Sequence, residues 1–508
     1  MGSRRQAPFR PHLLLVLLTL VAAIVRFGDL TAQSFWLDEY LWTRNAAGSV
    51  RDILRLGDGY PPLFGLLVHA QLQAGLASDW WLRAPSALAG TLAVPLTYAI
   101  GRRVAGYAPA LAAAALLAVN PMAIWYSQEC GAYALVVLMA LASTLCFLRL
   151  LAGGGVRDAY GYTGALFLGF GLHYYFVFVV VAQALVATWD AVRRPQRRVF
   201  WACMACAAAA TLAVWGQAFL CDLGSQSAED SGRQMSLLAL PYTMLTFVGG
   251  FSLGPPLRSL HRTLYGDAPL WTVVAPYSVV TVLALGVTTV LAALASTRRW
   301  TVSRALTALL VVVPVLGAWL ASMLLVGYRP RYAVAALPLA AIWCASALRT
   351  RFRPLAGALL IVLASLELAA LRQIDDRDYA REDTRAAAAY VTGHDPHATV
   401  VLVGAATGSF NRYAGATAYL VTILPHDLDD EASFHARMGG ALARGGDVWL
   451  LSSRPWTIDP NDRVRAVLDE ALAPREEMHF AGVIVRRYVL ASTRTAAVAV
   501  GAPTHVLP

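Results

Sequence analysis

The sequence contains no lysine, and it has few charged residues of any kind. All 41 basic side chains are arginine, and charged residues make up 14% of the chain, against about 25% in a typical soluble domain. Hydrophobic residues account for 58%, and the mean hydropathy is +0.55. This composition predicts that lipid, rather than water, solvates most of the chain. Any basic side chain that binds a phosphate here must be an arginine or a histidine.

Several common kinds of functional site are missing from the sequence. It has no phosphate-binding P-loop, no glycine-rich dinucleotide fingerprint, no zinc-protease helix motif and no convincing hydrolase triad. Cys203 and Cys206 have the spacing of a redox or zinc pair but lie in an apolar segment without further ligands, so we interpret them as small buried residues. The net charge of +10 comes largely from short arginine clusters between apolar segments, which does not indicate nucleic-acid binding.

Eleven apolar segments are candidates for crossing a bilayer, which takes roughly 20 helical residues. They are residues 12–28, 82–101, 107–121, 131–151, 159–172, 174–190, 199–220, 269–295, 303–326, 332–348 and 355–371. Arginine clusters occupy every second connection between them, and such clusters mark the cytoplasmic side. The pattern predicts a polytopic α-helical membrane protein with about eleven transmembrane helices, its N-terminus inside and its C-terminus outside.

One further apolar stretch does not fit this topology as a span. Residues 61–77 could be a further span, but this would put Arg102 and Arg103 outside and invert every later cluster. We therefore expect a helix that lies along the outer face, within a long outer loop over residues 29–81. The first apolar segment resembles a signal peptide but lacks a convincing cleavage site, so we expect it to be retained.

The composition changes sharply after residue 372. Residues 1–372 are expected to form the membrane-embedded catalytic domain, and residues 373–490 a water-soluble α/β domain on the outer face. Its strands are predicted at 398–404, 418–424, 447–452 and 480–490, and its helices at 383–392, 430–444 and 461–472. The tail, residues 491–508, is predicted to be disordered.

Two adjacent acids, Asp38 and Glu39, follow the first apolar segment. Carboxylates so close to a span are costly unless they face water, and membrane proteins usually keep them for chemistry or transport. Asp38 is a candidate general base, although it could simply start an interfacial helix over residues 39–47. Glu129 follows the helix-stopping Asn-Pro pair at 120–121. It could bind a sugar hydroxyl, share a divalent cation with Asp38, or be a solvated interfacial glutamate.

Arginine and aromatic side chains at the outer ends of the segments are candidate ligands for a sugar phosphate. Arg331 lies where the ninth and tenth segments meet, and it could hold a phosphate in bidentate fashion or snorkel at the interface. For the aromatic candidates the alternative is an ordinary interfacial belt. The further candidates are Arg44, Arg83, Tyr60, His173 and Tyr174.

The motifs of the chain occur in a familiar order. An acidic pair after the first span is followed by YPPLF, LRAPSALAG before an arginine pair, NPMAIWYSQECGAYAL, GLHYYF and RPRYAVAALP. Over roughly residues 10–350 this order resembles the GT-C membrane glycosyltransferases, particularly their bacterial branch related to protein O-mannosyltransferases and lipid A aminoarabinose transferases. The resemblance implies transfer of a sugar from a polyprenyl-phosphate carrier to an acceptor on the outer face, with inversion at the anomeric carbon.

The resemblance also implies roles for individual residues. Asp38 matches the family's acidic residue that acts as base or orients the acceptor, and Glu39 matches its second acid. Glu129 and Tyr133 match a Gln-Glu-x-Arg-x-Tyr pattern, in which Gly131 stands where relatives commonly have arginine. The other arginines that could hold the phosphate or sugar in its place are Arg44, Arg83 and Arg331.

We therefore expect an inverting glycosyltransferase in the bacterial cytoplasmic membrane, with its active site on the periplasmic or extracellular side. Its donor would be a polyprenyl-phosphate-linked hexose or pentose, and its acceptor a lipid, a glycan or a protein. A divalent cation is possible, and nucleic acid is not an expected partner. The alternatives are a transporter or flippase of a lipid-linked sugar and an inactive relative that binds lipid-phosphate. A transporter predicts ionisable groups near the bilayer midplane, where Glu367 is the main example.

Overall fold

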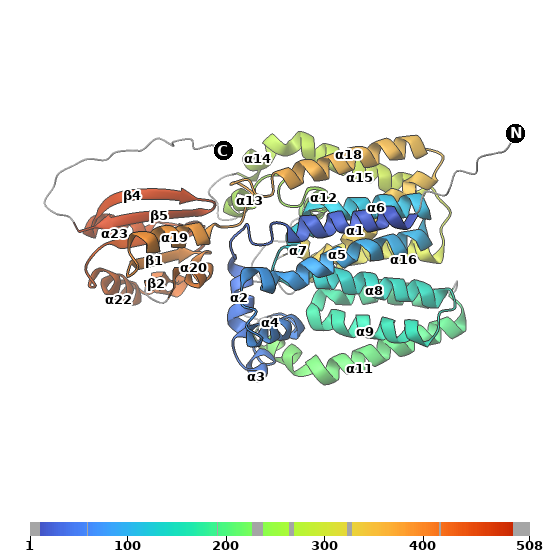
Figure 1. Cartoon of the computed structure of the whole chain (residues 1–508), viewed down its shortest axis with the longest axis horizontal. Coiled ribbons are helices and arrows are strands. Elements are labelled where there is room, and N and C mark those ends of the chain that lie inside the picture. The colour runs from blue at the N-terminus through green and yellow to red at the C-terminus, as the bar shows by residue number, and fades with distance from the viewer. Residues whose placement is uncertain are drawn as a thin grey trace. The chain divides into compact units, whose positions relative to one another are not determined.

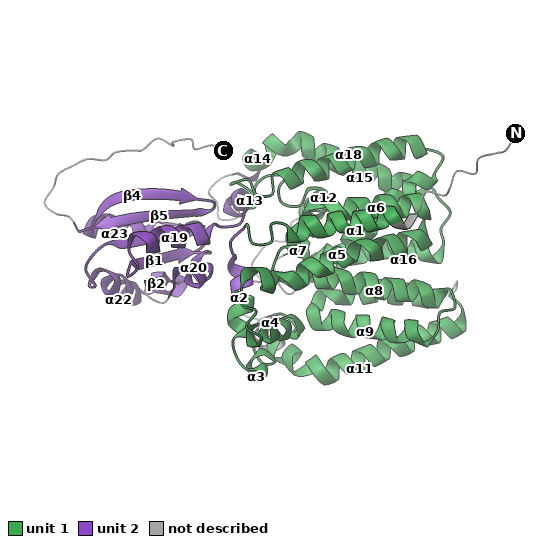
Figure 2. Cartoon of the chain, viewed as in Figure 1, with its two compact units in different colours: residues 1–32, 41–257, 271–379 green, residues 33–40, 258–270, 380–508 purple. Residues whose placement is uncertain are grey.

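The structure of the protein is a computed structural model that describes residues 11–57, 59–189, 192–225, 237–263, 269–322, 328–415 and 418–490. The chain divides into two compact units, coloured separately in Figure 2. Unit 1 contains Met1–Ala32, Leu41–Leu257 and Trp271–Tyr379, and unit 2 contains Gln33–Tyr40, Arg258–Leu270 and Ala380–Pro508. The tail predicted to be disordered lies outside the described residues.

Unit 1 is built from helices, most of which are labelled in Figure 1. Its α-helices are α1 (Pro11–Phe27), α3 (Val50–Ile53), α4 (Leu63–Gln73), α5 (Asp79–Val104), α6 (Tyr107–Val119), α7 (Pro121–Ser127), α8 (Tyr133–Leu151), α9 (Val156–Leu172), α10 (Val177–Thr188), α11 (Arg194–Ser225), α12 (Ala239–Gly249), α14 (Leu270–Val274), α15 (Ser278–Ser296), α16 (Val302–Ala321), α17 (Leu337–Ala345) and α18 (Arg353–Arg372). Its 3₁₀ segments are η1 (Tyr174–Phe176), η3 (Ala275–Tyr277), η4 (Pro330–Ala336) and η5 (Ser346–Arg349). Helix α2 (Leu37–Ala46) contains residues of both units.

Each of the eleven predicted spans coincides with one helical element or with two or three consecutive ones. Within the described residues, seven helices are long and apolar enough to cross a membrane, or eight if the bent pair α6–α7 is one span. The other three predicted spans are α1, α9 and η1–α10, of which the first two have 17 residues each. The polytopic helical fold is thus confirmed, whereas the number eleven and the orientation remain predictions.

The stretch at 61–77 forms α4, a helix of 11 residues. At 1.5 Å per residue this helix is far too short to span a hydrocarbon core of about 30 Å. Its position along the outer face remains a prediction. A second short apolar helix, α12, lies between the predicted spans 199–220 and 269–295 and was not predicted.

The Asn-Pro pair at 120–121 stops helix α6, as the sequence predicted, and the chain continues directly as α7. Helices α6 and α7 meet there at an angle of 56°. Asn120 caps α7, because its side chain accepts a hydrogen bond from the backbone N–H of Ala123 (3.0 Å). Its amide nitrogen donates to the Phe247 carbonyl on α12 and to Glu367 Oε1 on α18, both at 2.8 Å. The bend is therefore fixed by two neighbouring helices.

Unit 2 contains a five-stranded sheet in the order β2-β1-β3-β5-β4. Strands β1 (Thr399–Gly404), β2 (Tyr419–Ile423) and β3 (Val448–Ser453) are parallel, while β5 (Val483–Val489) runs antiparallel to β3 and β4 (Ala473–Phe480). Parallel strands joined by helices give the α/β character that the sequence predicted. The helical elements are α13 (Leu257–Thr263), α19 (Thr384–His394), α20 (Thr407–Ala414), α21 (Pro425–Asp429), α22 (Glu431–Leu442), η6 (Pro455–Thr457) and α23 (Arg463–Ala471).

Helix α20 and strand β4 were not predicted. The core strands β1 and β3 are almost wholly buried, so their apolar runs were easy to recognise. Strand β4 is an exposed edge strand whose residues, APREEMHF, are largely polar. Such a strand carries little hydrophobic signal, so most of it fell between the predicted helix 461–472 and the predicted strand 480–490.

Candidate functional site

The buried imidazole of His173 lies among four tyrosine rings of unit 1. Its ring centroid lies 5.4 Å from that of Tyr133, 5.5 Å from Tyr175, 5.8 Å from Tyr332 and 5.9 Å from Tyr60. These residues come from four places in the sequence: the α3–α4 connection, the start of α8, the α9–η1 junction and η4. We call them, together with Arg331, the His173 cluster.

Arg331 completes this cluster from η4. Its guanidinium carbon lies 5.4 Å from the Tyr133 ring centroid and 6.0 Å from that of Tyr332, within the range of a cation–π contact. Arg331 is only 5% exposed. An arginine held between two rings away from water is a strong binding group for an anion, since screening by solvent is reduced there.

His173 Nε2 and the Tyr175 hydroxyl are buried without a hydrogen-bond partner among the described residues. The other imidazole nitrogen, Nδ1, accepts the backbone N–H of Tyr175 at 3.2 Å. Burial, and secondarily the positive charge of Arg331, lowers the pKa of His173 to about 3, so the ring is neutral. With Nδ1 as acceptor, Nε2 carries the proton and can donate to a ligand.

Asp222, near the end of α11, supports one side of the cluster. Its carboxylate accepts the backbone N–H of Gly59 at 2.8 Å, next to Tyr60, and also the hydroxyl of Tyr174. Asp222 is 3% exposed. One buried acid therefore ties the α3–α4 connection to the chain segment that follows His173.

The turn between α7 and α8 contains Glu129, which is 1% exposed, and Gly131. A methyl group added to Gly131 would lie 2.7 Å from Glu129 Oε1, so the carboxylate folds over this glycine. The hydroxyl of Ser86 on α5 donates to the Gly131 carbonyl at 2.9 Å. The next ring along the chain, Tyr133, belongs to the His173 cluster. The turn thus connects the acid directly to the cluster.

A buried arginine that the sequence reasoning missed holds the start of this turn. Arg26 on α1 is fully buried, and it donates to the carbonyls of Leu117 (3.0 Å) and Ala118 (2.9 Å) at the end of α6. Its Nε donates to the Ser127 hydroxyl at 3.2 Å. Arg26 caps a helix end that the bend would otherwise leave unsatisfied.

Asp38 and Glu39 belong to unit 2, where they occupy the first turn of α2. Asp38 is half-buried, and helix α2 begins one residue before it. Glu39 is fully buried and forms an ion pair with Arg381 (3.5 Å) while accepting the backbone N–H of Trp36 (3.3 Å). Acids in a first turn are favoured by the helix dipole, so both residues have a structural reason for their position as well.

The segment before these acids is anchored to the C-terminal region within unit 2. The Phe35 backbone N–H donates to the Tyr413 hydroxyl at 2.9 Å, and the Ser34 hydroxyl donates to Asp383 at 2.8 Å. The guanidinium of Arg412 lies 4.4 Å from the Phe35 ring centroid. The C-terminal region therefore fixes the residues that lead into the acidic pair.

The remaining predicted site residues have other contacts. Arg83 is buried and donates to the Leu30 carbonyl at 2.8 Å, so it holds the loop that follows α1. Arg44 is exposed on α2. Tyr174 bonds to Asp222, as described above. Of the predicted residues in unit 1, the structure thus places Tyr60, Tyr133, His173 and Arg331 in one cluster.

Sequence reasoning missed Tyr175, Tyr332 and Asp222 as site residues. The two tyrosines are direct neighbours of predicted residues in HYY and PRY, and their stacked rings are 4.5 Å apart. That adjacency was a usable signal, whereas nothing near Asp222 in the sequence indicates its partners. Among the described residues there is no group of three or more His, Cys, Asp or Glu side chains that could hold a metal ion.

Comparison with known proteins identifies the fold. The family model for dolichyl-phosphate-mannose-protein mannosyltransferase matches residues 60–216. The structure of ArnT from Cupriavidus metallidurans matches with a TM-score of 0.58 and 12% sequence identity over 93% of this chain and 97% of ArnT. ArnT bound to undecaprenyl phosphate gives 0.55, also at 12% identity and with the same coverage of both chains.

A more distant protein has the same fold. The archaeal oligosaccharyltransferase AglB from Archaeoglobus fulgidus, in complex with an inhibitory peptide and a dolichol-phosphate, matches with a TM-score of 0.53. The identity is 12%, over 95% of this chain and 74% of AglB. No curated protein sequence matches this chain. The resemblance to GT-C glycosyltransferases related to O-mannosyltransferases and ArnT is thereby confirmed.

Proposed function

We propose that this protein is an inverting glycosyltransferase that moves a sugar from a polyprenyl-phosphate carrier to an acceptor on the outer face of the bacterial cytoplasmic membrane. The observation that carries the proposal is the His173 cluster. A buried guanidinium lies there beside two buried polar atoms that have no partner among the described residues. Such an arrangement suits a ligand that brings a negative charge and hydroxyl groups together.

Each part of such a donor has a matching group in unit 1. Arg331 would hold the phosphate, with His173 Nε2 as a second donor. The tyrosine rings would pack against the faces of the sugar, and the Tyr175 hydroxyl would bond to it. Glu129, folded over Gly131 next to Tyr133, would accept a hydrogen bond from a sugar hydroxyl. The polyprenyl chain would lie in the lipid among the spans.

The reaction needs a base on one side of the anomeric carbon and a cation on the other. By resemblance, Asp38 would take the proton from the acceptor hydroxyl as that oxygen attacks the carbon and the bond to the phosphate oxygen breaks. The products would be the inverted glycoside and polyprenyl phosphate. Arg331 would stabilise the charge that develops on the leaving phosphate, which is worth a few kcal/mol in a water-poor site.

Glu39 would act through its ion pair with Arg381. This pair and the contacts of the 33–36 segment connect the acidic motif to the C-terminal region within unit 2. We infer that the C-terminal region helps to shape the acceptor site on the outer face. Lipids, glycans and proteins remain possible acceptors, and a hexose and a pentose remain possible sugars.

The proposal is tested by following polyprenyl phosphate release from purified protein in nanodiscs. A panel of polyprenyl-phospho-sugars serves as donors and a crude envelope extract as acceptor, with and without EDTA. Wild type should release the carrier, Arg331→Gln should be slower by about 10²–10³-fold, and Asp38→Asn by roughly 10²–10⁴-fold. Loss of release in EDTA would identify a required divalent cation.

The chain offers matched controls for both variants. Arg329 is an exposed arginine two residues before Arg331, and Asp29 is an exposed acid that follows α1. Arg329→Gln and Asp29→Asn should leave release nearly unchanged. Release that survives Arg331→Gln would refute the assignment of the phosphate site. Donor binding without any release would favour an inactive relative, and sugar-lipid movement across the bilayer would favour a flippase.

A further inference from the structure

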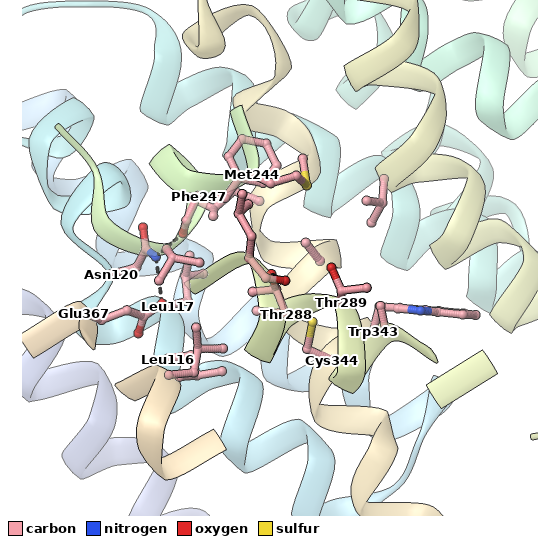
Figure 3. A pocket seen from close by; sticks show the side chains of 18 residues that line it. Leu116, Leu117, Asn120, Met244, Phe247, Thr288, Thr289, Trp343, Cys344 and Glu367 are labelled. Atoms are coloured by element: carbon pink, nitrogen blue, oxygen red, sulfur yellow. Dashed lines mark hydrogen bonds between the residues drawn. The ribbon is translucent and has the colours of Figure 1, made fainter. Parts of the chain in front are cut away.

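A second polar site lies deep among the helices of unit 1, apart from the His173 cluster. Helices α6, α12, α15, α16, α17 and α18 surround a cavity of about 200 Å³, shown in Figure 3. Its wall is mainly Leu, Val, Ala, Met and Phe side chains. The exceptions include Glu367 on α18 and Asn120 at the α6–α7 bend.

Glu367 is only half satisfied in this position. Its side chain is 3% exposed, and Oε1 accepts the Asn120 amide at 2.8 Å (Figure 3). The second oxygen, Oε2, is buried without a hydrogen-bond partner among the described residues. A structural role in holding the bend accounts for Oε1 alone. In a cavity with mainly apolar walls, an unmade hydrogen bond of a buried carboxyl group costs free energy, so a ligand that completes it is stabilised.

The dimensions and surroundings of the cavity limit what can bind. An apolar cavity of about 150 Å³ holds a benzene molecule, so about 200 Å³ holds a head group and a few carbons of a longer chain. Thr289 on α15 lines the cavity and is exposed at the surface of unit 1, and only 22% of an apolar 18-residue window within the span Leu270–Ser296 is buried. A lipid-soluble molecule can therefore reach the cavity from the bilayer.

The chemistry of the Glu367 carboxyl group determines which head group a ligand of this cavity can have. An ionised Oε2 needs a donor, whereas a protonated one needs an acceptor. An ammonium group serves only the first state and a carbonyl only the second. A hydroxyl serves both. We propose that this cavity binds a long-chain alcohol, with its hydroxyl on Glu367 Oε2 and its chain leaving past α15 into the lipid. This site does not depend on the proposed transferase activity.

Photolabelling tests the proposal directly. Full-length protein in phosphatidylcholine nanodiscs is labelled with a diazirine-bearing dodecanol, and the modified peptides are mapped. Labels are expected on α15, α17 and α18. Unlabelled dodecanol should compete at a concentration about tenfold lower than dodecane, which is the effect of one hydrogen bond. If the alkane competes equally well, the hydroxyl site does not exist.

Two neighbouring alanines of α15 provide a matched pair of variants. Ala292 lines the cavity and Ala293 is exposed. Ala292→Phe should reduce labelling about tenfold, whereas Ala293→Phe should leave it within about twofold, since only the first fills the cavity. Equal labelling of both variants would overturn the proposal.

Variants of Glu367 separate the hydroxyl contact from simple filling of space. Glu367→Gln keeps an acceptor for Asn120 and a polar atom for the hydroxyl, so labelling should persist. Glu367→Leu should lose it; persistence there would refute the role of the carboxyl group. Unlabelled farnesol and unlabelled dodecanol are then compared as competitors of the photolabel. Stronger competition by farnesol identifies the bound molecule as an isoprenoid alcohol, and stronger competition by dodecanol identifies it as a straight-chain alcohol.

Discussion

Replacing Asn120 by alanine should destabilise unit 1 through three hydrogen bonds at once. The side chain caps α7 by accepting the Ala123 N–H, and its amide donates to the Phe247 carbonyl and to Glu367 Oε1. No other residue joins α6, α7, α12 and α18 through so many side-chain bonds at the α6–α7 bend, within the residues that the structure describes. Alanine also leaves the buried carboxyl group of Glu367 with neither oxygen bonded.

The magnitude follows from the kinds of bond that are lost. A lost N-cap costs about 1 kcal/mol. Interhelical hydrogen bonds in membrane proteins are worth about 0.6 kcal/mol on average and up to about 1.7 kcal/mol. One cap and two interhelical bonds therefore amount to roughly 2–3 kcal/mol. Since Glu367 contributes to this sum only through Asn120, a second substitution at Glu367 should not add its full cost.

A double-mutant cycle measures this coupling. Asn120→Ala, Glu367→Leu and the double variant are unfolded in mixed micelles by titration with SDS, and the transition is followed by tryptophan fluorescence. The free energies of unfolding should show a coupling of about 0.6–1.7 kcal/mol between the two positions. The reasoning would be refuted if the losses of unfolding free energy in the two single variants add up to the loss in the double variant within about 0.5 kcal/mol. It would also be refuted if Asn120→Ala alone lowers the free energy of unfolding by less than about 0.5 kcal/mol.

Three further predictions concern single side chains. Asp222→Asn removes the charge that holds the Gly59 N–H and the Tyr174 hydroxyl, so donor turnover should fall about tenfold while the fold is retained. Tyr174→Phe breaks only one of these two hydrogen bonds and should reduce turnover less. Equal reductions in the two variants would contradict this account. Because burial lowers the pKa of His173 to about 3, the pH profile of activity between pH 5 and 8 should keep its apparent pKa values in His173→Asn. Burial alone would raise the pKa of Asp427 in unit 2, but hydrogen bonds from backbone and side-chain donors outweigh this effect and lower the pKa. Its contribution to stability should be present above about pH 4 and lost as the pH falls. The amide hydrogens of α22 should therefore exchange faster in Asp427→Asn than in wild type at neutral pH, and the two exchange rates should converge in acid.

The helices of unit 1 could be predicted because each apolar run carries its own signal. A run of 17 or more apolar residues, or a break at Asn-Pro, needs no knowledge of the rest of the fold. The small sheet could be predicted for the same reason, except for the exposed strand β4. Local sequence is sufficient wherever the cause of the structure is local.

The site could be predicted only in part, since its contacts are not local. Tyr60 and Arg331 are 271 positions apart in the sequence, and both contribute to one cluster. The individual residues were chosen for their chemistry and their place at segment ends, but their partners were unknown. The Glu39–Arg381 pair shows the same limit: the resemblance identifies Glu39 as the second acid of the family's pair, but it does not indicate that an arginine from the C-terminal region lies against it.

A substitution at Gly131 tests which arginine binds the donor phosphate in the proposed reaction. The arginine that the resemblance implies is missing there, and of the three proposed substitutes Arg331 is the one whose guanidinium contacts the ring of Tyr133, two residues from the glycine. If Arg331 takes over that arginine's role, Gly131→Arg should restore at least about tenfold of the activity lost in Arg331→Gln, a fraction of the 10²–10³ that one such group supplies. The new side chain would displace Glu129 from its place over the glycine and could pair with it, which would keep the charge near the turn. Gly131→Gln in the same background is the uncharged control. A folded double variant with no recovery would show that the two positions hold different parts of the donor, and the cation would then have to be sought at Arg44 or Arg83.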